Sequence, residues 1–126
     1  MSPTTAAQLK AAQRRAYRSN EPIWWCNLGA RYATLDPPDL ARARKWYAKA
    51  AAAGDTSAKF ELGAMLVHGE GGAIDLKRGR RLLEAAAREG HVSALRMLEH
   101  GYRVGAWGLP RSPRRARFFQ RQLERL

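Results

Sequence analysis

The chain has little cysteine and no long apolar run, and each of these shortages excludes some classes of protein. Cys26 is the only cysteine among 126 residues, so neither an internal disulfide nor a zinc site built from cysteines can form. Its sequence neighbours are apolar, which favours a small buried side chain over a reactive thiol. No stretch approaches the roughly 20 apolar residues that cross a bilayer, and residues 1–18 lack the apolar core of a signal peptide. We therefore expect a cytoplasmic protein that does not engage a membrane.

Acidic residues are also scarce, above all near the two ends of the sequence. The chain has 23 lysines and arginines against 11 acids, for a formal net charge of +12. Residues 1–20 carry four basic residues and no acid, and residues 110–126 carry six arginines and one glutamate. Such a charge attracts acidic proteins, nucleic acid and anionic surfaces. We expect an acidic protein partner, with nucleic-acid binding through the arginine-rich termini as the alternative.

Groups that could converge into a reaction centre are few. The histidines His68, His91 and His100 lack the spacing of three or four residues that places two metal ligands on one helical face. Residues 69–75, "GEGGAID", lack the Lys-Ser/Thr ending of a phosphate-binding loop, and no strand precedes them. The carboxylates are scattered. We expect no enzyme activity: no catalytic residue, metal, cofactor or small-molecule substrate.

What the chain does contain is a repeat with a period of 36 residues. The segment "KWYAKAAAAGDTSAKFELG" at 45–63 returns as "RLLEAAAREGHVSALRMLE" at 81–99. An earlier copy is opened by Leu28-Gly29, which matches Leu62-Gly63. We expect a single domain over 1–126, with repeats at 24–57, 58–93 and 94–126. Repeats of this length indicate stacked structural units.

Each copy predicts a pair of helices. In the first helix a small or apolar residue recurs at every fourth position, as at Ala58, Leu62 and Leu66, so that one face is apolar. The second helix follows a capping residue and stops at a glycine, as at Asp75 and Gly90. Other expected caps are Asp36 or Asp39, and Ser112 with Pro113. With no alternating strand pattern in the sequence, the predicted fold class is all-α, a short solenoid of about three α/α-hairpins.

One more helix is predicted before the repeats, near residues 5–18. Its apolar side comprises Leu9, Ala12, Ala16 and Tyr17, and a basic stripe comprises Lys10, Arg14 and Arg18. We expect this helix within residues 1–20 to cap the open end of the stack. Trp24 and Trp25 are expected to seal its junction with the first repeat.

Residues 61–94 and 28–58 resemble the Sel-one-like repeat, a relative of the tetratricopeptide repeat. The hallmarks fall on Leu62-Gly63, Gly69 and Gly71, Asp75, Trp46-Tyr47, and Ala86-Ala87 with Gly90. The third copy departs from the pattern, with Leu98-Glu99 for the Leu-Gly pair and Arg111 for the Asp. The resemblance covers about 24–119. It implies a right-handed α/α solenoid that binds proteins as a bacterial adaptor, regulator, or immunity or secretion partner and does not catalyse reactions.

The last predicted helix holds most of the candidate partner-binding residues. Its arginines on one side are Arg114, Arg117, Arg121 and Arg125, which fall within about 80° of one another. Phe118 lands beside them, and an aromatic side chain rimmed by arginines is typical of an interface hot spot. The alternative is a solvated helix face with Phe118 covered by Trp107 or its loop. Arg103 and Trp107 complete the candidate set, and Trp107 either folds back on the last helix or stands exposed. The concave groove of the stack is the other candidate surface.

Overall fold

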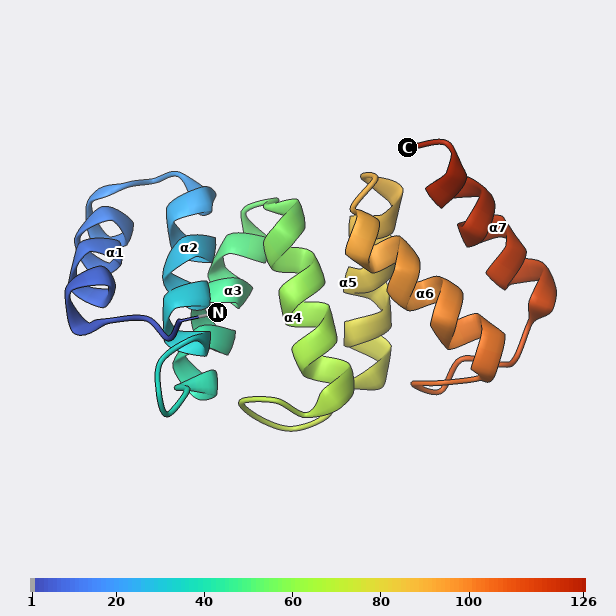
Figure 1. The fold of residues 1–126 in the computed structure, drawn as a ribbon, viewed down its shortest axis with the longest axis horizontal. Helices are drawn as coiled ribbons and strands as arrows, with labels where there is room; N and C mark the ends of the chain where they lie inside the picture. Colours follow the sequence, from blue (N-terminus) through green and yellow to red (C-terminus); the bar gives the residue numbers. More distant parts are fainter. Residues whose placement is uncertain (1) are drawn as a thin grey trace.

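Seven helices and no strand make up residues 2–126, the part of the chain that the computed structural model describes (Figure 1). The helices are α1 (Ala6–Arg18), α2 (Pro22–Ala33), α3 (Leu40–Ala52), α4 (Thr56–His68), α5 (Leu76–Arg88), α6 (Val92–Val104) and α7 (Pro113–Glu124). The pairs α2–α3, α4–α5 and α6–α7 form hairpins that follow one another along the long axis, with α1 at one end and α7 at the other (Figure 1). The predicted all-α solenoid of hairpins is confirmed.

Most helices begin at a residue whose side chain binds the first turn. In six of the seven, the side chain before the helix accepts a hydrogen bond from the backbone N–H three residues later, which satisfies a donor that the helix itself leaves free. These residues are Thr5, Asp39, Asp55, Asp75, His91 and Ser112. Of the two predicted caps for α3, the structure therefore uses Asp39. The helix α2 has no side-chain cap and begins with Pro22.

The second helices of the first two hairpins stop where the sequence predicts. Gly54 follows α3 with φ 98°, and Gly90 follows α5 with φ 85°. Side chains with a Cβ rarely adopt this left-handed backbone conformation, so glycine ends the helix at little cost. The chain then turns directly into the next hairpin.

The core runs along the stack as two adjoining clusters of leucine, alanine and tyrosine side chains. Its fully buried large residues are Leu28, Leu62, Leu83 and Leu98. Three of these are the matching leucines of α2, α4 and α6, so each hairpin supplies the same anchor. Burying one such side chain stabilises the fold by roughly 1.5–3 kcal/mol. Buried alanines, among them Ala50 and Ala86, let neighbouring helices approach closely.

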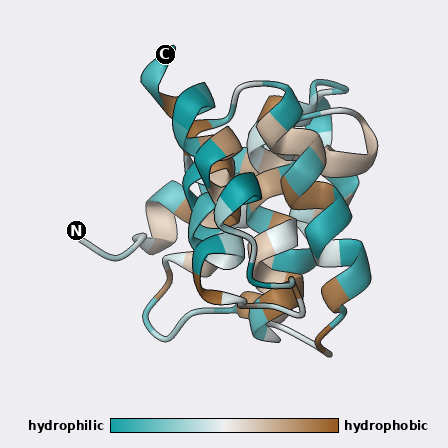
Figure 2. Cartoon of the chain, turned by 90° about the vertical axis from the view of Figure 1, so that its right-hand side faces the viewer, coloured by the Kyte–Doolittle hydropathy of each residue, from teal (hydrophilic) through white to brown (hydrophobic). Residues whose placement is uncertain are grey.

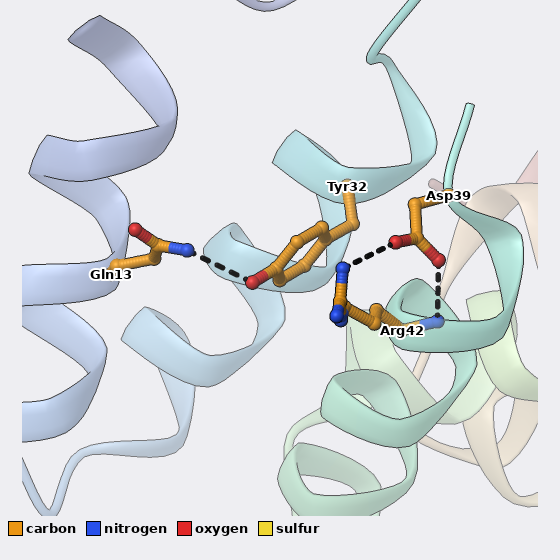
Figure 3. Close-up of polar contacts among 4 residues, drawn as sticks. All are labelled: Gln13, Tyr32, Asp39 and Arg42. Atoms are coloured by element: carbon orange, nitrogen blue, oxygen red, sulfur yellow. Dashed lines mark hydrogen bonds and ion pairs between the residues drawn. The ribbon is translucent and has the colours of Figure 1, made fainter. Parts of the chain in front are cut away.

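The helix α1 covers the first hairpin through two polar contacts and an alanine face. The Nε2 of Gln13 donates to the hydroxyl of Tyr32 at 3.0 Å (Figure 3), and the indole of Trp25 donates to the Ala16 carbonyl at 3.1 Å. Ala16 is buried in this contact. Tyr17 was expected on the same apolar side, and that prediction is wrong. Its ring is 66% exposed and lies edge-on against Trp46 of α3 at 5.5 Å.

Candidate partner-binding site

Glycines set the spacing between the two helices of the middle hairpin. A Cβ added at Gly79 of α5 would lie 2.6 Å from the Cγ1 of Val67 and 2.9 Å from the carbonyl oxygen of Gly63. A Cβ added at Gly63 would lie 3.0 Å from the carbonyl oxygen of Gly79. Real Cβ atoms essentially never lie closer than 3.0 Å to another heavy atom, so α4 and α5 approach as closely as they do because Gly79 lacks a side chain and Gly63 leaves hardly any room for one.

The last hairpin has large residues at the two matching positions. Thirty-six residues after Gly63 and Gly79, the chain has Glu99 and Arg115. The helices α6 and α7 therefore cannot repeat the close contact of the middle hairpin. The Arg115 side chain instead lies over Tyr102, with Nη1 donating to the tyrosine hydroxyl at 3.1 Å and the guanidinium 5.4 Å from the ring centroid.

A groove of about 640 Å³ lies between α5, α6 and α7. Its lining residues are Glu84, Ala87, Arg88, Leu95, Tyr102, Arg115, Phe118, Phe119 and Gln122. The rings of Tyr102 and Phe119 stack with centroids 5.8 Å apart, and Phe118 meets Phe119 edge-on at 5.2 Å. Phe118 is 54% exposed, so neither Trp107 nor its loop covers it. The groove thus combines an aromatic lining with two arginines.

Basic side chains dominate the surface beside this groove. Arg114, Arg117, Arg121 and Arg125 are all exposed, as their predicted common side requires. Within residues 2–126, none of the four forms an ion pair. Seen from the α7 end, hydrophilic colours predominate along the chain that leads to the C-terminus (Figure 2). This end of the solenoid therefore presents uncompensated positive charge next to an exposed phenylalanine.

The other two candidate residues lie outside the groove. Trp107 has φ 53° and folds back on α6 rather than on α7, so close to Gly101 that a Cβ there would lie 2.8 Å from the indole. Its ring centroid is 5.9 Å from those of both His68 and His100. Arg103 donates from Nε to a Glu99 carboxylate oxygen at 3.1 Å. A part for Arg103 and Trp107 in partner binding remains a prediction.

A second cleft, of about 610 Å³, lies at the opposite end of the stack between α1 and α2. Three exposed arginines line it, namely Arg14, Arg15 and Arg18. The guanidinium of Arg15 lies 4.3 Å from the ring centroid of Trp24. Of the two tryptophans expected to seal this junction, Trp25 does so through its bond to α1, whereas Trp24 lies partly exposed in the cleft.

Two further titratable groups are tied to the packing of the stack. Burial, followed by the charge of Asp55, raises the pKa of the Cys26 thiol to about 12, so the thiol stays protonated at neutral pH. The Nδ1 of His91 accepts from the Ala94 backbone N–H at 3.3 Å, and burial lowers the pKa of this histidine. Residues 2–126 contain no group of three or more side chains placed to hold a metal ion. None of their helices is both long and apolar enough to cross a membrane.

Sequence reasoning did not assign the inner lining of the groove. The predicted partner-binding set includes none of its inner residues, which are Arg88, Tyr102, Arg115, Phe119 and Gln122. The repeat itself indicates that Arg115 is unusual, because the matching position of the middle copy is Gly79. The loss of the Leu-Gly pair at Leu98-Glu99 pointed to the same difference.

The chain is similar to known proteins along most of its length. The model of the Sel1 repeat family matches residues 26–55, 56–91 and 96–119. Over 58 residues the chain is 38% identical to an exopolysaccharide production negative regulator from Rhizobium meliloti (strain 1021). That match takes in 45% of this chain and 22% of the regulator, so the chain spans only a small part of this relative.

Two solved structures share the fold. A Sel1 repeat protein from Oxalobacter formigenes has a TM-score of 0.81 at 22% identity, covering 93% of this chain and 47% of that one. The protein c5321, a protective antigen present in uropathogenic Escherichia coli strains that displays an SLR fold, has a TM-score of 0.81 at 24% identity, covering 94% of this chain and 25% of that one. The hairpin stack and the matches of the family model to all three repeats agree: the chain belongs to the Sel1 repeat family.

Proposed function

We propose that the protein is a non-catalytic adaptor that binds an acidic protein through the α7 end of its solenoid. The observation that carries the proposal is the exposed ring of Phe118 among the exposed arginines of α7. Aromatic residues and arginines are enriched where single side chains contribute most to binding. Sel1 repeat proteins generally mediate protein–protein interaction, and stacked hairpins hold such side chains on a rigid frame.

The charge of the chain supports an acidic partner. Positive charge on one face speeds the encounter with a negative partner and disfavours basic competitors. A relative that is a negative regulator supports a regulatory form of the proposal, in which binding changes the activity of the partner. An immunity or chaperone-like role toward a toxin or effector is a narrower form of the same mechanism.

Affinity capture from an extract of the source organism tests the proposal. The bait is the wild-type chain, compared with the double variant Arg117→Glu with Arg121→Glu, both residues being exposed on α7. We expect the wild type to retain an acidic protein at physiological salt, and the variant to lose it while its helix content and melting temperature stay unchanged. Exposed substitutions of this kind usually change stability by less than about 0.5 kcal/mol.

A matched control is available on the middle hairpin. Lys77→Glu with Arg81→Glu makes the same change in net charge on exposed positions of α5, so it separates the α7 site from a general effect of charge. We expect this control to retain the partner. If the wild type retains no protein, the adaptor function is wrong, and if the α7 variant binds as well as the wild type, the site lies elsewhere.

The cleft between α1 and α2 favours a second candidate function, which is binding to single-stranded nucleic acid. Three arginines beside the half-exposed Trp24 are suited to hold phosphates while a base stacks on the indole. Against this reading, the two basic ends lie at opposite ends of the stack (Figure 1). A gel-shift assay with a thymidine oligonucleotide at physiological salt decides the matter. No shift at micromolar protein excludes this function, and a shift that weakens steeply with salt supports it.

A further inference from the structure

We infer that the groove between α5 and α7 binds an acidic segment of the partner that inserts an apolar side chain and sets a carboxylate against Arg115 and Arg88. The inference rests on the proposed function, because it takes the partner to be acidic. It adds the place where the partner enters the solenoid and the side chains that the entering segment carries.

The groove offers an apolar side chain several apolar contacts. Leu95 and Tyr102 from α6 are each 3% exposed and form its floor, while Phe118 and Phe119 line the α7 wall. In the middle hairpin the residue that matches Phe118 is Leu82, and it packs against the core cluster of the preceding helices. Phe118 has no such cover and stays 54% exposed. An aliphatic or aromatic side chain from a partner would bury this ring as the core buries Leu82.

The charges in the groove favour a partner segment in which an acidic residue lies next to that apolar side chain. Arg115 is held over Tyr102 by a hydrogen bond to a neutral hydroxyl, which leaves its charge uncompensated. Arg88 is exposed on the opposite wall, and Glu84 is the only acid of the lining. The four exposed arginines of α7 stand beside the same opening. A guanidinium binds a carboxylate through two parallel hydrogen bonds, so a carboxylate fits here better than a neutral polar group.

A second copy of the chain is a poor occupant of this groove. Two copies joined through their α7 ends would bring like charges together, and the α1 end is also basic. Residues 1–20 hold no acid and residues 110–126 hold one. Neither end of the solenoid therefore supplies the carboxylates that the groove would bind, whereas an acidic partner does.

Nuclear magnetic resonance with a defined peptide tests the inference on the intact chain. The probe is the blocked hexapeptide acetyl-Asp-Glu-Phe-Asp-Glu-Leu-amide. One control peptide replaces both apolar residues by serine, and another replaces the acids by their amides. We expect the largest amide shifts at Leu95, Tyr102 and Phe119, and at least about tenfold weaker binding of both controls, because each lacks one of the two contacts.

Variants of the protein then assign the binding to the groove. Arg115→Gln should weaken binding of the hexapeptide about tenfold, because a charge-assisted contact is lost while the position stays polar. Phe118→Ser, at an exposed position that should tolerate the change, should weaken it comparably. Arg81→Gln, at an exposed position of α5 that does not line the groove, is the matched control and should bind like the wild type.

Three outcomes would overturn the inference: shifts that fall outside the groove, equal affinity for Arg115→Gln and the wild type, or a thymidine oligonucleotide that displaces the peptide and binds the groove more tightly. Affinity capture of the partner with the same variants distinguishes failure of this inference from failure of the proposed adaptor function. If Arg115→Gln and Phe118→Ser retain the partner while Arg117→Glu with Arg121→Glu loses it, the groove is not the site and the α7 adaptor stands. If the wild type captures nothing, the adaptor is wrong.

Discussion

The middle and the last hairpin have the same length and matching core leucines, yet they pack in different ways. In the middle hairpin, Gly63 and Gly79 bring α4 and α5 into direct backbone contact. In the last hairpin, Glu99 and Arg115 occupy those positions and a groove opens beside α7. The first hairpin follows the middle one, with Gly29 close to the carbonyl oxygen of Ala43. We therefore infer that a change at one pair of contact positions opens the groove that we propose as the binding surface.

The second helices of the two hairpins are both basic, so net charge alone does not distinguish them. The helix α5 has five basic residues and one acid, Glu84, and α7 has four arginines and one acid, Glu124. The difference is that the arginines of α7 stand beside the groove and the exposed side chain of Phe118, and aromatic residues among arginines are enriched in docking sites.

The largest difference that we expect between the hairpins is in how much their core residues contribute to the free energy of unfolding. Leu83 of α5 has no exposed surface, and Leu83→Ala should lower the free energy of unfolding by about 2–5 kcal/mol. The matching change Phe119→Ala removes a larger side chain but should cost less, because Phe119 lies half-buried at the groove. Urea unfolding followed by circular dichroism compares the two. A greater loss for Phe119→Ala would show that the last hairpin is packed as tightly as the middle one.

Exchanging the contact residues between the two hairpins should change stability by an intermediate amount, and the cost should be larger in the middle hairpin than in the last one. Gly79→Arg places the residue of the last hairpin into the middle one, where even a Cβ meets backbone and Val67. Because the added Cβ meets backbone, its steric cost should lie at the upper end of the usual range, about 3 kcal/mol, which is well above the ~0.5–1 kcal/mol gained by removing a helical glycine. The reverse change, Arg115→Gly, should cost only about 1 kcal/mol, mainly from helix propensity. Equal costs in thermal unfolding would contradict the difference in packing.

The smallest effect concerns pH. Burial, together with the charge of Glu70, raises the pKa of Glu61 above its ordinary value of 4.5. The folded state then binds this proton more tightly than the unfolded state, so the stability it contributes at low pH is lost as pH rises from 4.5 through the folded pKa. Glu61→Gln should remove this loss and make the protein slightly more stable at pH 7. The last hairpin has Met97 at this position and no such dependence.

Glu89 provides the control of opposite sign for the pH experiment. Hydrogen bonds from Lys59 and Thr56 lower its pKa, so the stability it contributes is present at neutral pH and lost as pH falls through the folded pKa. Melting curves for Glu61→Gln and Glu89→Gln between pH 3 and pH 7 should therefore diverge from the wild type in opposite directions. A lower melting temperature for Glu61→Gln at pH 7 would contradict the assignment for Glu61.

Features that depend on neighbours in the sequence were predictable. The cap at Asp75, the stop at Gly90 and the buried leucines follow from spacing and local hydrogen bonding, which a helix imposes on any sequence. The exposed arginine side of α7 follows from the same helical geometry. The position of Tyr17 was mispredicted because its contact with Trp46 depends on how α1 crosses the first hairpin.

The groove could not be predicted because it depends on distances between helices. Residue spacing along α7 correctly places the exposed Phe118 beside the arginines. Whether an empty volume remains between α5 and α7 depends on how near α7 approaches α6, and we attribute that approach to two positions in different helices. Trp107 is a similar case, because the sequence left open whether it folds back on the last helix or stands exposed, and the structure packs it against α6.

A crystal structure of the double variant Glu99→Gly with Arg115→Ala would test most directly whether these two residues create the groove. The variant copies the Gly29 and Ala43 pair of the first hairpin. We expect α6 and α7 to move together as α2 and α3 do, and the groove of about 640 Å³ to shrink markedly. A groove of unchanged volume, with α7 in its present position, would show that something other than the contact pair opens this end of the solenoid.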